Sequence, residues 1–396
     1  MTRLLQLLPR SVPPFAWLGA AMFSFGMGWS MFTAISTNFM VEELHIRPDQ
    51  LGLLESIREL PGLLTLLIGA LVMTVAEPVV GAAALLLVAI GYLNYFHVRT
   101  IEALVAFSLI GSVGFHLWWP VANTIALRLS ARETQGRRLG QLRSLGAIAQ
   151  LSGVAVVAAV VLVIGMRPIF IMSGMAVALG AVFVFRLRGA ISGGDHEEVR
   201  GRTRIVLRRR YWLYYMLTFL DGGRRHIFMT FAIFLLVRNH GVGVQTIALL
   251  GIVNGAMTVA GAYFFGRLID RVGERPVLVL AFGSLTVIFV GYATTSSLAV
   301  LFVLYILDNL FFSAELGITT YLRNILVTPD DLRPSLVAGM TMNHVAAVVV
   351  PLTGGILWQA FGHQVPFIGG AILAVISMGF STLVRYRRGE SSVPVM

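Results

Sequence analysis

The chain has 396 residues, of which 57% are hydrophobic and only 12% charged, and its mean hydropathy is +0.82. These values exclude a water-soluble globular protein, in which about a quarter of the residues are charged. The apolar residues come in runs of about 20, the length that crosses a hydrocarbon core of roughly 30 Å. The composition therefore predicts a polytopic membrane protein whose first partner is the lipid bilayer.

The formal net charge is +11, and all 30 basic residues are arginine. In a soluble protein such a charge would suggest nucleic-acid binding, but here the arginines cluster between apolar runs, and no nucleic-acid partner is expected. The absence of cysteine excludes disulfides, thiolate metal sites and cysteine nucleophiles. We expect no catalytic residues, no cofactor and no metal, because there is no phosphate-binding Gly-rich loop with its lysine and no metal-ligand spacing.

Apolar runs separated by proline, glycine and charge predict twelve transmembrane helices. In chain order the first six cover 15–41, 50–76, 79–98, 101–129, 139–165 and 167–187. The other six cover 211–238, 245–270, 275–295, 298–325, 335–360 and 364–385. The predicted fold class is an all-α integral membrane protein.

The distribution of arginine predicts the orientation. Of the 30 arginines, 23 lie in or next to the loops and tails on the side that carries both termini, four lie at the other side, and three lie deep within spans. Cytoplasmic segments retain positive charge during insertion. We therefore expect a multi-pass protein of the inner (plasma) membrane with both termini in the cytoplasm.

A polar stretch at 188–210 divides the chain into two halves, 1–187 and 211–396. The halves share weak sequence similarity: Gly69 to Glu77 aligns with Gly266 to Glu274, and Leu127-Arg128 aligns with Leu322-Arg323. Both matches fall in corresponding loops, which indicates an internal duplication. We predict two pseudo-symmetric six-helix bundles joined by a cytoplasmic linker.

The loop after the eighth span carries the pattern Gly-x-x-x-Asp-Arg-x-Gly-x-Arg. Together with the arrangement of six spans, a basic loop and six more spans, this loop resembles the major facilitator superfamily of secondary transporters. The resemblance implies alternating access, with helices 1, 4, 7 and 10 lining a central cavity. It also implies a cytoplasmic gate at Gly266, Asp270, Arg271, Gly273 and Arg275. A turn needed only for topology is the alternative interpretation of this loop.

Ionisable side chains within spans mark the candidate site, because each costs roughly 2.5 to 3.5 kcal/mol on insertion scales unless it is paired or faces a cavity. In the seventh span, Asp221 precedes Arg224 and Arg225 by three and four residues, so it can neutralise one of them on the same helix face. One acid cannot neutralise both arginines, which mildly favours an anionic or zwitterionic substrate. An internally satisfied structural ion pair is the alternative.

In the tenth span, Asp308 and Glu315 are seven residues apart and are expected to share a helix face, with Asn309 beside it. A carboxylate in low dielectric that approaches and leaves an arginine can couple proton uptake to conformation. Asp308 is the first candidate for proton coupling, and Glu315 the second. The predicted substrate-binding residues are Arg224, Arg225, Asp221, His116 and Asn309.

Other polar residues within spans have no assigned role. Glu55, Arg58 and Glu59 in the second span can neutralise one another, and His344 in the eleventh span is the remaining candidate. The sequence as a whole predicts a secondary active transporter of a small solute and not an enzyme, with protons as the coupling ion. An exported amphipathic compound is an equally open substrate class. A non-transporting receptor or scaffold that keeps the fold is the alternative function.

Overall fold

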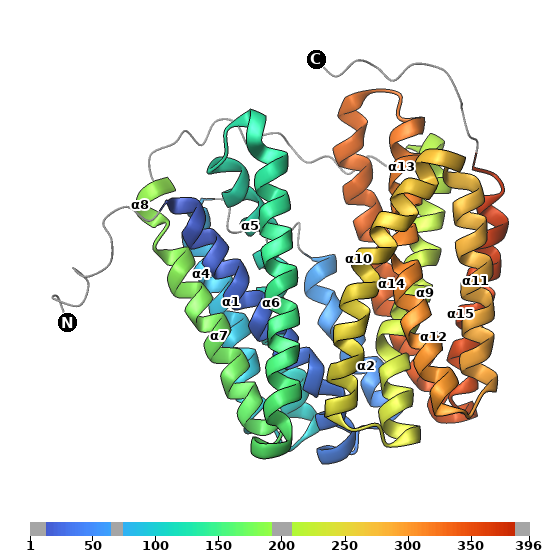
Figure 1. Cartoon of the computed structure of the whole chain (residues 1–396), viewed down its shortest axis with the longest axis horizontal. Helices are drawn as coiled ribbons and strands as arrows, with labels where there is room; N and C mark the ends of the chain where they lie inside the picture. The colour runs from blue at the N-terminus through green and yellow to red at the C-terminus, as the bar shows by residue number, and fades with distance from the viewer. Residues whose placement is uncertain (1–12, 65–73, 192–207, 385–396) are drawn as a thin grey trace. The chain divides into compact units, whose positions relative to one another are not determined.

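The computed structural model describes residues 13–64, 74–191 and 208–384. Within these residues the chain forms twelve long helical spans, which confirms the predicted fold class (Figure 1). The first six are α1 (Pro14–Asn38, continued by a π-helical turn Phe39–Glu43), α2 (Pro48–Leu63), α4 (Glu77–Asn94), α5 (Ile101–Arg128), α6 (Gln135–Ile164) and α7 (Arg167–Phe185). The others are α9 (Trp212–His240), α10 (Val244–Val272), α11 (Glu274–Thr294), α12 (Leu298–Phe311) with α13 (Glu315–Ile325), α14 (Leu332–Phe361) and α15 (Gln364–Ser381).

Proline and glycine set many of the helix ends. Proline occupies the first turn of α1, α4 and α7, where its missing N–H has no helical partner in any case. Glycine in a positive-φ conformation follows α6, α9, α10 and α14, at Gly165, Gly241, Gly273 and Gly362. The boundaries therefore follow from local backbone chemistry, which is why the sequence predicts most of them closely.

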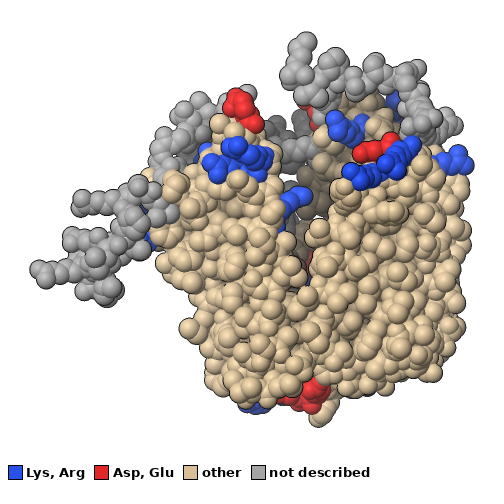
Figure 2. Space-filling view, viewed as in Figure 1, with Lys and Arg blue, Asp and Glu red and all other residues tan. Residues whose placement is uncertain are grey.

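Ten of the described spans are long and apolar enough to cross a membrane by composition alone. The two others are α2 and α9, and these are the helices that carry the embedded charge clusters. The faces that the chain shows in Figure 2 are almost free of charged side chains except near the helix ends, as a hydrocarbon environment requires.

The chain divides into two compact units. Unit 1 comprises residues 1–44, 64–200 and 243–252, and unit 2 comprises 45–63, 201–242 and 253–396. In unit 1, α1 packs on α6 and α7, and α4 packs on α5 and α7. In unit 2, α14 packs on α2 and α9, and α11 packs on α15. The predicted linker 188–210 is described only at Arg188–Ile191 and from residue 208, because 192–207 lie outside the described residues.

Unit 2 includes α2 because this helix packs closely against α14. A Cβ atom added to Gly52 would lie 3.1 Å from the Gly355 Cα and would overlap the Pro351 carbonyl oxygen. The two backbones therefore touch where the helices cross, and small residues are what permit this approach.

Replacing Gly52 with alanine is expected to lower the stability of the protein by about 1–3 kcal/mol, since the new methyl group has no space between α2 and α14. Thermal unfolding of purified protein measures the effect. Gly369→Ala on α15 is the matched control, because its Cβ would have no heavy atom within 4 Å. Equal melting temperatures for the two variants would contradict the close helix crossing.

Each unit contains a contact between the start of one helix and the end of the next. In unit 1, Glu77 at the start of α4 forms an ion pair of 2.8 Å with Arg128 at the end of α5. In unit 2, Glu274 at the start of α11 accepts a 2.6 Å hydrogen bond from the Asn324 side chain near the end of α13. An acid at the start of one helix thus binds the end of the next in both units.

The tenth span departs from the prediction of one continuous helix over 298–325. α12 ends at Phe311, a 3₁₀ turn covers Phe312–Ala314, and α13 begins at Glu315. Gly261 of α10 lies against the break, where a Cβ atom would be 2.6 Å from the Leu310 carbonyl oxygen. A 3₁₀ turn inside a helix changes the facing of every later side chain. Asp308 and Glu315 thus lie on opposite sides of this break, one on α12 and one at the start of α13.

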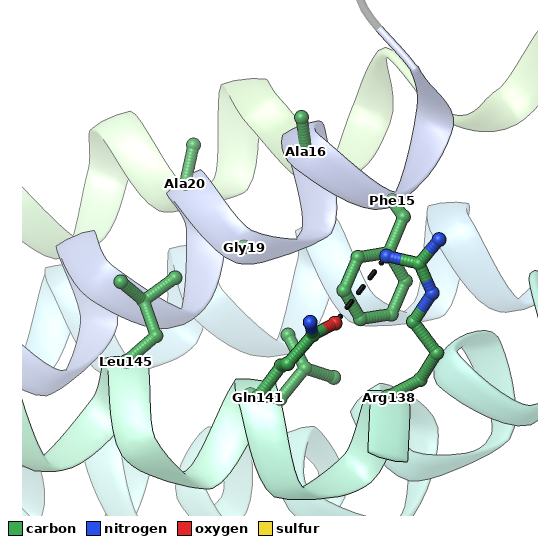
Figure 3. A pocket seen from close by; sticks show the side chains of 8 residues that line it. Phe15, Ala16, Gly19, Ala20, Arg138, Gln141 and Leu145 are labelled. Atoms are coloured by element: carbon green, nitrogen blue, oxygen red, sulfur yellow. Dashed lines mark hydrogen bonds between the residues drawn. The ribbon is translucent and has the colours of Figure 1, made fainter. Parts of the chain in front are cut away.

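Between α1 and α6 lies a cavity of about 410 Å³ (Figure 3). The Arg138 guanidinium lies 4.4 Å from the centre of the Phe15 ring and donates a 3.3 Å hydrogen bond to Gln141. This cavity contains none of the predicted substrate-binding or proton-coupling residues. The embedded charges gather instead inside unit 2.

Candidate functional site

The charges of the seventh span form a compact group on α9. Asp221 Oδ1 accepts a hydrogen bond from Arg224 Nη2 at 3.0 Å, and Oδ2 accepts one from Arg225 Nη2 at 2.8 Å. The spacings of three and four residues place both guanidinium groups over the same carboxylate. The sequence-based expectation was that Asp221 neutralises one arginine, and the structure shows that it bridges both.

Arg224 has a second carboxylate partner on α12. Its Nη1 lies 3.1 Å from Asp308 Oδ1, and both side chains are 0% exposed. A charge this deeply buried is stable only when it is paired, and Arg224 is held between acids on two helices. The predicted approach of Asp308 to the arginines of the seventh span is thus present in the structure.

Arg225 also has a second carboxylate partner, which lies beyond the helix break. Its Nη1 is 2.7 Å from Glu315 Oε2, and its guanidinium lies 4.3 Å from the centre of the Phe312 ring. The Glu315 side chain is 54% exposed, in contrast to Asp308. Both acids therefore contact arginines of α9, but each has its own arginine and its own environment.

These five side chains form what we call the acid–arginine network: Asp221, Arg224, Arg225, Asp308 and Glu315. It contains three carboxylates and two guanidinium groups, so it carries one surplus negative charge when all three acids are ionised. On α9 alone, two arginines and one acid leave one surplus positive charge. Asp308 of α12 and Glu315 of α13 add two carboxylates, so this surplus is not present in the folded protein. A proton is the smallest species that would restore neutrality.

Asp308 has one carboxylate oxygen without a partner. Its Oδ2 is buried and has no hydrogen-bond partner among the residues that the structure describes. The Tyr292 hydroxyl of α11 is likewise buried without a partner in the described part of the chain, and it interacts electrostatically with Asp308. Unpaired buried polar atoms are costly in an apolar interior. They are typical of groups whose protonation or partner changes during function.

Sequence reasoning missed the polar residues around Asp308. Besides Tyr292, the Asn254 side chain of α10 lies beside the Tyr305 hydroxyl of α12. The only signal available was the presence of tyrosine and asparagine within apolar spans. Asn309, which was predicted to bind substrate, is half-buried and donates a 2.9 Å hydrogen bond to the Tyr305 carbonyl of its own helix.

His116, another predicted substrate-binding residue, belongs to unit 1. Its Nδ1 lies 3.1 Å from Ser112 Oγ and 2.9 Å from the Ser112 carbonyl oxygen on α5. It adjoins aromatic rings of α1 and α5: the Phe115 ring centre is 5.4 Å from the imidazole and 5.8 Å from the ring of Trp29. His116, Phe115 and Trp29 are all half-buried.

The predicted gate residues lie at the end of α10 and the start of α11. Gly266 is inside α10, and Gly273 has φ +85° at the junction, so Gly273 is the residue that permits the turn. Asp270, Arg271 and Arg275 are exposed. Their role as a latch stays a prediction.

The model of the Major Facilitator Superfamily matches the sequence over residues 18–322 and 213–394. The chain belongs to the major facilitator superfamily. It is therefore a multi-pass membrane protein of a transporter family, as the resemblance implied. No curated protein matches the sequence.

Solved structures of other superfamily transporters share the fold. A point mutant of the nucleoside transporter NupG aligns with a TM-score of 0.78 at 14% identity, covering 94% of this chain and 99% of that one. A bacterial homologue of the human lysosomal transporter Spinster, inward-facing and occupied, aligns with a TM-score of 0.73 at 15% identity, covering 94% and 97%. At these identities the likeness concerns the fold alone.

Proposed function

We propose that this member of the superfamily is a proton-coupled secondary transporter that moves a small solute by alternating access. Membership of the family supports transport. The observation that supports protons is the acid–arginine network, in which three carboxylates meet two arginines and one carboxylate oxygen, Asp308 Oδ2, has no partner among the described residues.

The network suggests how protonation would act. With Asp308 ionised, Arg224 is shared between Asp221 and Asp308, and the network holds one surplus negative charge. Protonation of Asp308 removes that charge and weakens its bond to Arg224, which then relies on Asp221. α9 and α12 are held together by the Arg224–Asp308 contact, so the strength of their packing changes with the proton. Glu315, at the exposed end of the network, is a route by which a proton reaches it.

The charge count also bears on the solute. The network supplies no surplus positive charge, so we propose a zwitterionic or amphipathic solute rather than a simple anion. The half-buried aromatic rings beside His116 on α1 and α5 supply apolar, planar surfaces for such a molecule. Binding sites for small molecules commonly combine aromatic walls with a few polar groups.

Proteoliposomes with a trapped pH indicator test this proposal. Solutes from a panel that includes nucleosides, amino acids and amphipathic amines are added outside, after a thermal-shift screen has selected those that stabilise the protein. A transported solute is expected to change the internal pH, and protein-free liposomes are the control. Uptake that moves no protons and ignores an imposed pH gradient would contradict proton coupling. Tight binding without any uptake would favour a receptor.

A further inference from the structure

A second titratable pair connects α2 and α14 inside unit 2. His344 Nδ1 lies 3.0 Å from Glu59 Oε2, and the two side chains are only 17% and 23% exposed. Glu59 is eleven residues from the first residue of α2 and His344 twelve from that of α14. At 1.5 Å per residue both lie about 16–18 Å along their helices, roughly half the thickness of a bilayer core.

The pair is fixed by the packing around it. One turn before Glu59, the Ser56 hydroxyl donates to the Val348 carbonyl of α14, and a turn further on Gly52 touches Gly355. Because the helices touch at these points, Glu59 and His344 cannot separate far without moving α2 away from α14.

Within unit 2, other charged and titratable groups lie near the pair on α2 and on α9. On α2, Arg58 forms a 2.6 Å ion pair with Glu55. On α9, His226 is 9% exposed and interacts electrostatically with Glu59, His344, Arg225 and Asp221. The remaining neighbour of α14, α15, has no titratable residue in its sequence.

In the cluster on α2, as in the acid–arginine network, the carboxylates outnumber the arginines by one. α2 carries two carboxylates in its middle, Glu55 and Glu59, and one arginine, Arg58. With a neutral imidazole at His344 the cluster holds one surplus negative charge, and with an imidazolium it is neutral. The two clusters, on α2, α9, α12, α13 and α14, together contain five carboxylates and three arginines. One added proton in each cluster would therefore make both clusters electrically neutral. Histidine is the side chain that ordinarily gains or loses its charge between about pH 5 and 8.

We propose that Glu59 and His344 form a second proton-binding site, separate from Asp308, in which the proton resides on the imidazole and joins α2 to α14. This inference rests on the proposed proton-coupled function. When the proton is bound, Glu59 and His344 form an ion pair, and the cluster that they form with Glu55 and Arg58 has no net charge. When the proton leaves, the cluster regains a negative charge and the contact between the helices weakens, so the site links proton release to the separation of α2 from α14.

Counting bound protons tests the site without knowledge of the solute. Purified full-length protein in detergent, free of buffer, is titrated between about pH 5 and 8 with the proton itself as the probe. His344→Gln is expected to bind about one proton fewer per molecule than the wild type. Glu59→Gln is expected to show the same loss, because the proposed site needs both members of the pair to hold the proton. Glu59→Gln preserves the shape of its side chain, and so provides the answer if His344→Gln does not fold.

His226→Gln is the matched control, since this imidazole lies in the same cluster and donates no hydrogen bond to a carboxylate that the structure records; it is expected to keep the full count. A full count in both His344→Gln and Glu59→Gln would overturn the site, as would a proton lost only in His226→Gln. Asp308→Asn should lose a different proton. A full count in that variant would count against the proposed function, while a loss in His344→Gln would still support this site.

Discussion

Replacing Arg224 with leucine is expected to cause the largest loss of stability of any substitution in the acid–arginine network, about 3–5 kcal/mol. Arg224 is the only arginine that contacts Asp308 among the described residues, and both side chains are fully buried. Its removal leaves the Asp308 charge in low dielectric without a counter-ion. Thermal unfolding of purified protein, monitored by size-exclusion chromatography after heating, measures the effect.

Two comparisons separate this explanation from simple loss of packing. Arg225→Leu should cost less, because Asp221 keeps Arg224 and the other partner, Glu315, is more than half exposed. The double variant Arg224→Leu with Asp308→Leu should regain much of the loss, since it removes both members of the buried pair. A double variant as unstable as Arg224→Leu alone would show that the cost comes from the shape of the arginine and not from its charge.

Replacing Asp308 with asparagine is expected to abolish accumulation driven by a pH gradient while leaving the fold and solute binding intact. The asparagine oxygen can still accept from Arg224, which also keeps Asp221, but the side chain can no longer exchange a proton. For one proton per solute, a gradient of one pH unit is worth about 1.4 kcal/mol, or a tenfold accumulation. The variant should reach equal concentrations on both sides.

The measurement is uptake into proteoliposomes of a solute identified by the panel, with and without the imposed gradient. Glu315→Gln on the same span is the comparison variant: its carboxylate is 54% exposed, so water can take over its part in proton transfer and accumulation should continue. Solute exchange without a gradient should continue in Asp308→Asn. Full gradient-driven accumulation by this variant would rule out Asp308 as the coupling residue.

The sequence by itself determined the features that depend on local spacing. Twelve spans follow from apolar runs and from the proline and glycine residues that begin and end them. The pairing of Asp221 with an arginine of its own helix follows from spacings of three and four residues, which bring side chains together wherever the helix lies, although the structure alone showed that it bridges both Arg224 and Arg225. These interactions need no knowledge of the neighbouring helices.

Only the tertiary structure decided how the embedded charges are balanced. Asp308 and Glu315 both contact α9, but only the packing of α12 and α13 against it pairs one with buried Arg224 and the other with Arg225. The pairing of Glu59 with His344 joins residues 285 positions apart, and it depends on the close crossing of α2 and α14. Sequence periodicity fixes which residues share a helix face, whereas packing between helices selects the partner that each buried charge requires.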